Sequence, residues 1–303
     1  MGTKGKIKFA LFKTLPTDLY LKIVYRYYIG GKLNLKNPER FTEKLFWLKK
    51  YNSTVMPEFM KQIYDKYTAR EYITSKIGEG HLPKLYGVFS NADDIDFSLF
   101  PEKYVLKVSQ SNGFNIINDG TLKMTHKEII SKMREWLKIA RTKNLIQKRM
   151  TEESYYFNGD ALIICEEYLE DASGNAAMDT DFWCFNGKPQ FHEVYHDYII
   201  NGRPNPNCYK NIYLLDGQYL PVSITKKTNP SLARPEYKNF QEMISIAEKL
   251  SEDFVFVRVD LYNVNGHIYV GELTPMPIGG KVIINPVCYD YEWGKMLKLP
   301  IMP

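Results

Sequence analysis

The stretch VRVDLYNVNGHIYVGELT, residues 257–274, constrains the fold more than any other part of the chain. Apolar residues alternate with other residues on both sides of Asn265-Gly266, a dipeptide typical of two-residue β-hairpin turns. Because successive side chains of a strand point to opposite faces, the pattern predicts two antiparallel strands. An antiparallel sheet must therefore form part of the fold.

The first of these strands carries charge on the face that is not apolar. Arg258 and Asp260 share this face, and a charged pair beside a buried face is costly unless it has partners. Glu272 on the returning strand supplies a second carboxylate, and two carboxylates on neighbouring strands suit Mg²⁺. A simple surface pair between Arg258 and Asp260 is the alternative.

Asp260 and Glu272 can face each other only if the hairpin is irregular. The numbers of residues paired across a hairpin have a constant sum, and a two-residue loop at Asn265-Gly266 makes that sum odd. The sum of 260 and 272 is even. We therefore expect either a loop with an odd number of residues or a β-bulge between the strands.

The stretch QFHEVYHDY, residues 190–198, contains the H-E-x-x-H spacing of many zinc proteases, from His192 to His196. That site needs a helix, on which residues i and i+4 lie about 6 Å apart. Here the motif follows the turn dipeptide Asn186-Gly187 and alternates as a strand does. Four residues of a strand span about 13 Å, so the two histidines cannot share one zinc ion. A zinc protease is therefore excluded.

The remaining chain predicts a mixture of helices and strands. Helices are expected within residues 17–64, 65–78, 125–140 and 240–251, and strands within 82–89, 103–109, 161–169, 181–185 and 189–196. Thr125 with Glu128, and Asn239 with Glu242, have the spacing of capping boxes at two helix starts. The predicted class is α+β with antiparallel sheets.

Positive charge is concentrated near the start of the chain, whose 303 residues carry a net charge of +5. Residues 1–50 hold 12 Lys and Arg against 3 Asp and Glu, so the remaining residues have a balance of −4. This distribution argues against a nucleic-acid-binding surface over the whole protein. The stretch LYLKIVYRYYIGGK, residues 19–32, is interpreted first as a solvated helix face, and a basic aromatic face that touches a membrane surface is the alternative.

The apolar stretches and the cysteines of the sequence indicate where in the cell the protein is expected. No run of 18 apolar residues occurs, so no membrane-spanning segment is expected. The basic start of the chain is too interrupted for a signal peptide, and we expect the protein in the cytoplasm, at the inner face of the membrane. The 4 cysteines form no C-x-x-C pair, which argues against a disulfide framework or a structural zinc site.

Two further stretches suggest a nucleotide site. Lys107 ends a predicted strand and is followed by the loop SQSNGFN, and a strand-end lysine beside backbone N–H groups can hold phosphates. In LIICEEYLE, apolar residues run directly into Glu166-Glu167, which would suit a purine base in an apolar slot. A structural loop and a strand that ends at the surface are the alternatives.

The order of these pieces is similar to that of ATP-grasp enzymes, and the chain most resembles the TupA-like ATP-grasp family, named for teichuronopeptide synthesis. The resemblance covers about residues 15–295 and rests on LNLKNPERFTEKLFWLKKYN, DKYTAREYI, EEYLED, CFNGKP and the hairpin above. It implies two α+β lobes that clasp ATP, with an N-terminal helical extension. The implied division is an extension at 1–64, a lid lobe at 65–165 and a second lobe at 166–303.

The resemblance also implies roles for single residues. The nucleotide site would comprise phosphate contacts from Lys66 and Lys107, a mobile loop with Ser109, Ser111 and Gly113, and an adenine slot with Glu166, Glu167 and Leu169. The Mg²⁺ ligands would be Asp260, Glu272 and Thr274. Arg258 and Lys107 would be catalytic, since they would stabilise charge on the transferred phosphoryl group.

The chain departs from the family pattern at several positions. The phosphate loop is poorer in glycine, and PMPIGG follows ELT where the family tends to have T-P-G-S-G. Asp181, in DTDF, stands where the family usually has a lysine. These departures bear on substrate choice, because Asp181 replaces a lysine that could contact nucleotide or substrate. His192 and His196 are interpreted first as satisfied structural histidines, and a place in the acceptor pocket is the alternative.

The activity that the resemblance implies is ATP-dependent ligation of a carboxylate to an amine through an acyl phosphate. Its cofactors would be ATP and Mg²⁺, and its setting the biosynthesis of cell-surface polysaccharide. The partners would be a uronic acid or glycan carboxylate and an amino acid or amino sugar, or the reverse pairing. A sugar kinase, a glycosyltransferase using the DTD motif at 179–181, and an inactive nucleotide-binding scaffold remain alternatives.

Overall fold

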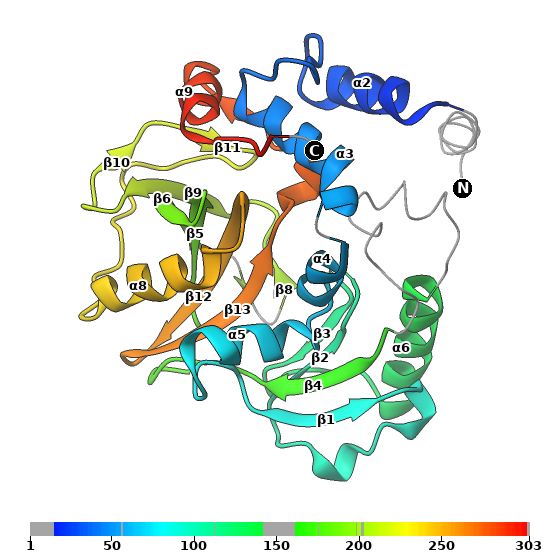
Figure 1. Cartoon of the computed structure of the whole chain (residues 1–303). Coiled ribbons are helices and arrows are strands. Elements are labelled where there is room, and N and C mark those ends of the chain that lie inside the picture. Colours follow the sequence, from blue (N-terminus) through cyan, green and yellow to red (C-terminus); the bar gives the residue numbers. More distant parts are fainter. Residues whose placement is uncertain are drawn as a thin grey trace.

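The computed structural model describes residues 15–55, 57–111, 113–141, 161–174, 176–197, 199–200 and 203–301. These residues form two lobes, each built on an antiparallel sheet (Figure 1). The smaller sheet has the strand order β1-β4-β2-β3, and the larger has the order β10-β9-β6-β5-β12-β13. The predicted α+β class with antiparallel sheets is therefore confirmed.

The small lobe packs one long helix on its four strands. Its elements are β1 (Leu85–Phe89), η1 (Ala92–Asp94), η2 (Phe97–Leu99), β2 (Tyr104–Val108), β3 (Asn115–Asn118), α6 (His126–Ala140) and β4 (Ile163–Glu167). The helix α6 buries Ile129, Met133 and Leu137 against the sheet. The predicted capping box is confirmed, because the Thr125 side chain accepts from the Glu128 N–H while the Glu128 carboxylate accepts from the Thr125 N–H.

The large lobe is built on the six-stranded sheet, with the helix α8 on one of its faces. Its elements are β5 (Asp179–Phe185), β6 (Lys188–His196), β9 (Tyr209–Leu214), β10 (Tyr219–Leu220), α8 (Phe240–Ser251), β12 (Phe256–Val264) and β13 (His267–Thr274), with the short pairs β7 (Ile199–Ile200) and β8 (Arg203–Pro204), and β11 (Ser223–Ile224) and β14 (Ile284–Asn285). Both predicted Asn-Gly hairpins are present, with positive φ at Asn186, Gly187, Asn265 and Gly266. The capping box predicted at Asn239 is absent, because its side-chain amide instead donates to Glu242 and to the Gly266 carbonyl.

The β12-β13 hairpin contains the predicted β-bulge. The strands keep one register from the turn to Leu261, after which Asp260 pairs with Glu272. Gly271 is the extra residue on β13, and a Cβ there would lie 2.6 Å from the Tyr262 ring. Any larger residue would require this ring to move. The bulge therefore brings the two carboxylates onto the same face of the sheet.

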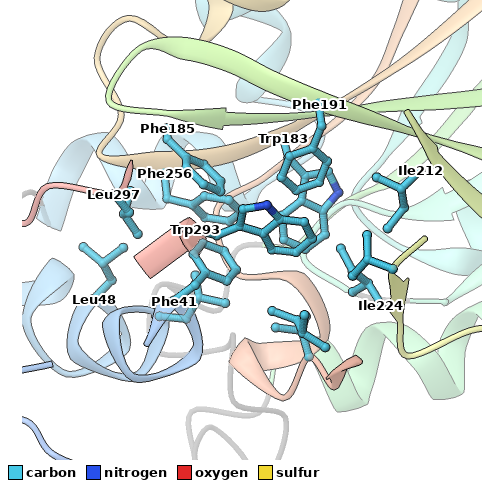
Figure 2. Close-up of a cluster of buried hydrophobic side chains, with 14 of the residues drawn as sticks. Phe41, Leu48, Trp183, Phe185, Phe191, Ile212, Ile224, Phe256, Trp293 and Leu297 are labelled. Atoms are coloured by element: carbon cyan, nitrogen blue, oxygen red, sulfur yellow. The ribbon is translucent and has the colours of Figure 1, made fainter. Parts of the chain in front are cut away.

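The face of the large sheet opposite α8 is aromatic at one end, where it packs against α3 (Phe41–Val55) and α9 (Cys288–Met296). Figure 2 shows the rings that meet there, from Phe41, Trp183, Phe185, Phe191, Phe256 and Trp293. Phe191 and Trp293 stack with ring centroids 4.3 Å apart. Because burying one such side chain stabilises a fold by roughly 2–3 kcal/mol, this cluster is a strong attachment of both helices to the sheet.

The helix α3 belongs to the large lobe rather than to a separate extension. Where α3 begins, the Arg40 side chain and the Thr42 N–H donate to the Asp290 carboxylate of α9, at 2.7 and 2.8 Å. A Cβ at Gly294 would lie 1.9 Å from the Glu39 carbonyl, so glycine is required at this backbone contact. The predicted domain boundary after residue 64 thus places α3 in a different domain from the aromatic core of the large lobe, in which it packs. The predicted boundary after residue 165 lies inside the strand β4.

Three other helices and one turn complete the described chain. They are α2 (Thr17–Tyr28), α4 (Pro57–Tyr64), α5 (Ala69–Ile77) and η4 (Pro277–Gly280). Every helix among the described residues is too short or too polar to cross a lipid bilayer. The basic residues 1–14, Asn112 of the predicted phosphate loop and Tyr198 lie outside the described residues.

The H-E-x-x-H segment forms part of strand β6, as predicted, and not a helix. His192 is fully buried on the α8 face, with ring centroids 5.6 Å from Phe182 and 4.9 Å from Phe240. His196, four residues along the same strand, points to that same face. Both histidines therefore lie on the face away from the cavity described below, which this segment lines with Tyr195, so the alternative that they line an acceptor pocket there is not supported.

The burial of His192 predicts an acid-sensitive fold. Burial, and then the nearby charge of Arg234, lower the pKa of His192 to about 3, and neither ring nitrogen has a hydrogen-bond partner among the described residues. Below the unfolded pKa of about 6.5, the unfolded chain gains a proton at this residue that the folded chain does not, so stability falls as pH falls. We expect His192→Phe to remove up to about 1.4 kcal/mol per pH unit from this slope between about pH 6.5 and 4.

Urea unfolding at a series of pH values measures this slope. Phe240→Leu provides the control, since it alters the same core beside His192 without removing a titratable group and should leave the slope as in the wild type. Equal slopes for His192→Phe and the wild type would contradict the prediction.

Candidate active site

Four carboxylates form a row across the large sheet, on the face opposite α8. Glu272 on β13 pairs with Asp260 on β12, Asp260 pairs with Asp181 on β5, and Asp181 pairs with Glu193 on β6. Residues directly opposite on antiparallel strands have Cβ atoms only about 5 Å apart, and like charges at that distance destabilise a sheet. This carboxylate row therefore requires cations beside it.

Each carboxylate of the row has a cationic partner. Arg258 binds Asp260 with two hydrogen bonds, of 2.6 Å from Nε and 2.5 Å from Nη2, and its Nε lies 3.4 Å from the Asp181 carboxylate. At one end of the row, Lys66 Nζ lies 2.8 Å from Glu272 Oε1. At the other end, Lys210 Nζ lies 2.8 Å from Glu193 Oε2, and both side chains are buried. The cations thus come from three different parts of the chain.

The row nevertheless holds more negative charge than Arg258 offsets. Burial raises the pKa of Asp260 to about 7, with Arg258 opposing the shift and the neighbouring Glu272 and Asp179 adding to it. Burial likewise raises the pKa of Asp179 to about 6, against a hydrogen bond with Tyr262 and the charge of Arg258. For Glu272, burial is outweighed chiefly by Lys66, and its pKa is lowered. A cation between Asp260 and Glu272 would offset part of this negative charge. Among the described residues, however, no group of three or more His, Cys, Asp or Glu side chains is arranged to hold a metal ion.

A second buried charge cluster joins the small lobe to α5, whose Tyr72 and Ile73 pack in the core of the large lobe. Glu166 on β4 accepts a hydrogen bond of 2.7 Å from Lys107 on β2 and another of 2.7 Å from Arg70 on α5. Arg70 also donates to the Pro83 carbonyl at 2.8 Å, which fixes the direction of its side chain. Burial would raise the pKa of Glu166, but Lys107, Arg70 and Lys66 together hold it below its usual range. Glu166 is therefore an ionised anchor for both cations.

Lys66 links the two lobes at the phosphate loop. Its Nζ donates to the Ser111 carbonyl at 2.7 Å while it pairs with Glu272, and its backbone N–H donates to the Ser109 carbonyl at 2.9 Å. The preceding Asp65 also binds the loop, because one of its carboxylate oxygens accepts hydrogen bonds from Ser109 Oγ and from the Gln110 side-chain amide. The loop is thus attached to the start of α5.

A cavity of about 320 Å³ lies between the lobes and is lined by these charged groups. A second cavity of about 150 Å³ adjoins it, since both are lined by Lys107, Asn115, Asp179, Tyr262 and Gly271. The second cavity is mainly apolar, with walls from Val105, Ile117, Leu169, Ala176 and Ala177. An apolar slot that opens into a cavity lined with lysines suits a nucleotide, with its base in the slot.

Comparison with protein families agrees with this geometry. A model described as TupA-like ATPgrasp matches residues 43–298. The chain belongs to the TupA-like ATP-grasp family. Its fold is therefore the ATP-grasp fold, as predicted.

Solved ATP-grasp structures are similar at low sequence identity. The D-alanine–D-alanine ligase of Bacillus anthracis complexed with ATP has a TM-score of 0.42 and 14% identity, over 71% of this chain and 55% of that one. The corresponding ligase of Helicobacter pylori has a TM-score of 0.43 and 11% identity, over 88% and 68%. The phosphoribosylamine–glycine ligase of Thermotoga maritima has a TM-score of 0.41 and 17% identity, over 80% and 57%.

Length separates this ATP-grasp chain from several of these proteins. It spans 55–57% of the Bacillus anthracis and Thermotoga maritima ligases. A comparison with curated proteins finds no match.

Most site residues that the ATP-grasp resemblance implied are brought together. The charged cavity is lined by Lys66, Lys107, Ser111, Gly113, Asp181, Arg258, Asp260 and Glu272. The apolar slot is lined by Glu167 and Leu169, with Tyr168 between them. These ten predicted residues come from segments more than 200 positions apart, and they meet at two adjoining cavities.

Three predicted residues have other contacts. Ser109 is fully buried, and its hydroxyl binds Asp65 and accepts from the Leu162 N–H, so it is a structural part of the loop. Thr274 pairs with Arg258 and lies beside its guanidinium, outside both cavities, so a direct metal contact is not supported. Glu166 lines neither cavity, because its carboxylate binds Lys107 and Arg70 instead of facing the adenine slot.

Several residues of the site were not predicted. Arg70 and Asp65 lie in the family stretch DKYTAREYI, but their partners are distant in sequence, and no local pattern indicates them. Tyr195, Tyr262 and Asp179, the last of which the sequence indicated only within the DTD motif of a glycosyltransferase, line the charged cavity. The alternation of side chains could have indicated these three, because each lies two residues from a residue of the carboxylate row.

The Arg70–Glu166–Lys107 cluster predicts a specific pattern of stabilities. Arg70→Met leaves the buried Glu166 with one cation, and we expect a loss of about 2–3 kcal/mol in the free energy of unfolding. Adding Glu166→Gln should recover part of that loss, because the partly compensated buried charge is removed. Urea unfolding of both single variants and the double variant gives the coupling energy. Additive effects of the two substitutions would contradict the cluster.

Proposed function

We propose that this chain is an ATP-dependent ligase that joins a carboxylate to an amine through an acyl phosphate. The observation that carries the proposal is a single cavity in which lysines and an arginine lie close to the carboxylates of Asp260 and Glu272. An apolar slot adjoins this cavity. Lys66 and Lys107 approach from one side, and Arg258, Asp260 and Glu272 from the other. Phosphoryl transfer needs mainly positioning and charge neutralisation, and these are the groups that supply them.

ATP would occupy both cavities. The adenine would lie in the apolar slot, against Val105, Leu169 and the backbone of residues 167–169. The phosphates would then extend into the charged cavity, where Lys66 and Lys107 would exchange their carboxylate partners for phosphate oxygens. Ser111 and Gly113 line the same cavity from the loop, and Gly113 has open space around its Cα. The loop would thereby cover the phosphates and exclude water.

Asp260 and Glu272 would hold Mg²⁺. The bulge at Gly271 places both carboxylates on one face. Burial chiefly raises the pKa of Asp260, the charges of Glu272 and Asp179 add to the shift, and a nearby cation would oppose it. The ion would supply neutralisation of the phosphate charge. Arg258 already holds both oxygens of Asp260, so it fixes the orientation of this ligand and places its own charge at the same end of the cavity.

The reaction would proceed in two steps. An oxygen of the substrate carboxylate attacks the γ-phosphorus of ATP, the bond to the β,γ-bridging oxygen breaks, and ADP leaves with that electron pair. The amine nitrogen then attacks the acyl carbon, loses a proton, and expels phosphate to leave an amide. Lys66, Lys107 and Arg258 would offset the charge that shifts between the phosphoryl oxygens during the first step.

The substrates that we propose come from cell-surface polysaccharide biosynthesis. Membership of a family named for teichuronopeptide synthesis supports a uronic acid as one partner and an amino acid or amino sugar as the other. Asp181, at the position where the resemblance implies a lysine in the family, lines the charged cavity beside Arg258, and we expect it to bear on the choice of the amine partner. Such an enzyme would act in the cytoplasm, at the inner face of the membrane.

Isotope transfer tests the proposed reaction directly. A uronic acid carrying ¹⁸O in its carboxyl group is incubated with ATP, Mg²⁺ and glutamate, and the reverse pairing uses ¹⁸O-labelled glutamate with glucosamine. The proposal predicts ADP, phosphate and amide in equal amounts, with one ¹⁸O atom per phosphate because the carboxylate oxygen leaves with the phosphoryl group. Mass spectrometry of the phosphate measures this, and Asp260→Asn should abolish it.

The alternatives give different products. A sugar kinase would release ADP with a phosphorylated sugar and no free phosphate. A glycosyltransferase would consume a sugar nucleotide without ATP. ATP binding without turnover, across both pairings and a panel of uronic acids and amines, would indicate a nucleotide-binding scaffold. Any of these three results would overturn the ligase proposal.

A further inference from the structure

The helix α2 has an apolar stripe on its outward side. Its inner side buries Tyr20, Leu21, Val24 and Tyr25 in a small core with Phe46 of α3. On the opposite side Leu19, Ile23 and Tyr27 are 45%, 46% and 79% exposed. Residues four apart lie one above the other on a helix, so these three side chains form a single line. The helix lies at the edge of the molecule (Figure 1).

Cations border this stripe. Lys22 and Arg26 are exposed and lie on the same side of α2, one helical step from the apolar line. Asp18, the acidic residue of this helix, pairs with Lys50 of α3 at 2.6 Å. The outward side of α2 is therefore cationic and apolar at once. The preceding residues 1–14 add four lysines and no acidic residue to the same region of the sequence.

We propose that the outward side of α2 docks on the surface of an anionic lipid bilayer, with Leu19, Ile23 and Tyr27 inserted between headgroups. A helix of this composition binds in the plane of the membrane interface through buried apolar area and attraction to anionic lipids. Each Lys or Arg near such a surface contributes about 1 kcal/mol. Lys22 and Arg26 lie where they would reach the headgroups while the stripe enters the acyl boundary.

The size of the surface favours a membrane over a protein partner. A 12-residue helix is about 18 Å long, so one side of it offers far less than the roughly 800 Å² per partner that stable protein interfaces bury. A bilayer needs no matching surface and accepts a narrow convex stripe. The inference does not depend on the proposed reaction, because it concerns a surface of α2 and not the cleft.

Vesicle co-sedimentation of the full chain tests the proposal. We expect binding to phosphatidylcholine vesicles that contain phosphatidylglycerol, and little binding to phosphatidylcholine alone. Leu19→Gln/Ile23→Gln/Tyr27→Gln should weaken binding about tenfold or more, because the inserted groups are lost while the charge is unchanged. Lys22→Glu/Arg26→Glu should weaken it to a similar degree, because attraction becomes repulsion. Urea unfolding of each variant confirms that α2 is intact.

A matched variant separates α2 from general electrostatic attraction. Lys123→Glu/Lys127→Glu changes the net charge equally at exposed positions of the small lobe, and it should bind the vesicles nearly as the wild type does. Absence of binding to anionic vesicles, or equal binding by the wild type and the Gln variant of α2, would overturn the proposal. Loss of binding in the small-lobe variant alone would also overturn it.

Discussion

The structure depends on the neutralisation of four carboxylates that the register of the large sheet places side by side. Placing the partly exposed Glu272 in one row with the buried Asp260, Asp181 and Glu193 is tolerable only because Lys66, Arg258 and Lys210 reach these carboxylates. The same face of the sheet is aromatic at its other end, where α3 and α9 seal it. One face of the sheet thus has two parts. An aromatic part is packed under α3 and α9, and a charged part lines the cavity between the lobes. The rigidity of the aromatic part positions the side chains of the charged part.

The Arg70–Glu166–Lys107 cluster completes this arrangement. Glu166 holds Lys107 and Arg70, and Lys66 bridges the phosphate loop to Glu272, so the cations of the cleft have partners before any nucleotide arrives. A polyphosphate would replace those carboxylates as the partner of Lys66 and Lys107. In the proposed ligase, Lys66 and Lys107 would therefore exchange carboxylate partners for phosphate oxygens when ATP binds. Because Lys66 contacts both the phosphate loop and Glu272, this exchange would couple the loop to the proposed metal ligands Asp260 and Glu272.

Sequence patterns predicted the parts of this design that depend on local periodicity. The parity of residue numbers across Asn265-Gly266 required a bulge, and the bulge is at Gly271. The patterns failed where packing between distant segments decides the outcome. They could not show that α8 covers the face of β6 that carries His192, so that Tyr195 on the opposite face lines the cavity. Nor could they show that the Ser109 hydroxyl donates a hydrogen bond to Asp65. The Arg70–Glu166 pair spans 96 positions and joins a helix to a strand, so no local signal reveals it.

Calorimetric titration of Mg-ATP into the wild type and Lys107→Ala tests the central claim most directly. The claim is that the two cavities form one ATP site whose cations are held ready by carboxylates. It predicts binding by the wild type that requires Mg²⁺ and is lost in Lys107→Ala, while Lys103→Ala, whose lysine pairs with Glu170 outside both cavities, binds as the wild type does. Undetectable binding by the wild type, or equal binding by Lys107→Ala, would contradict the account.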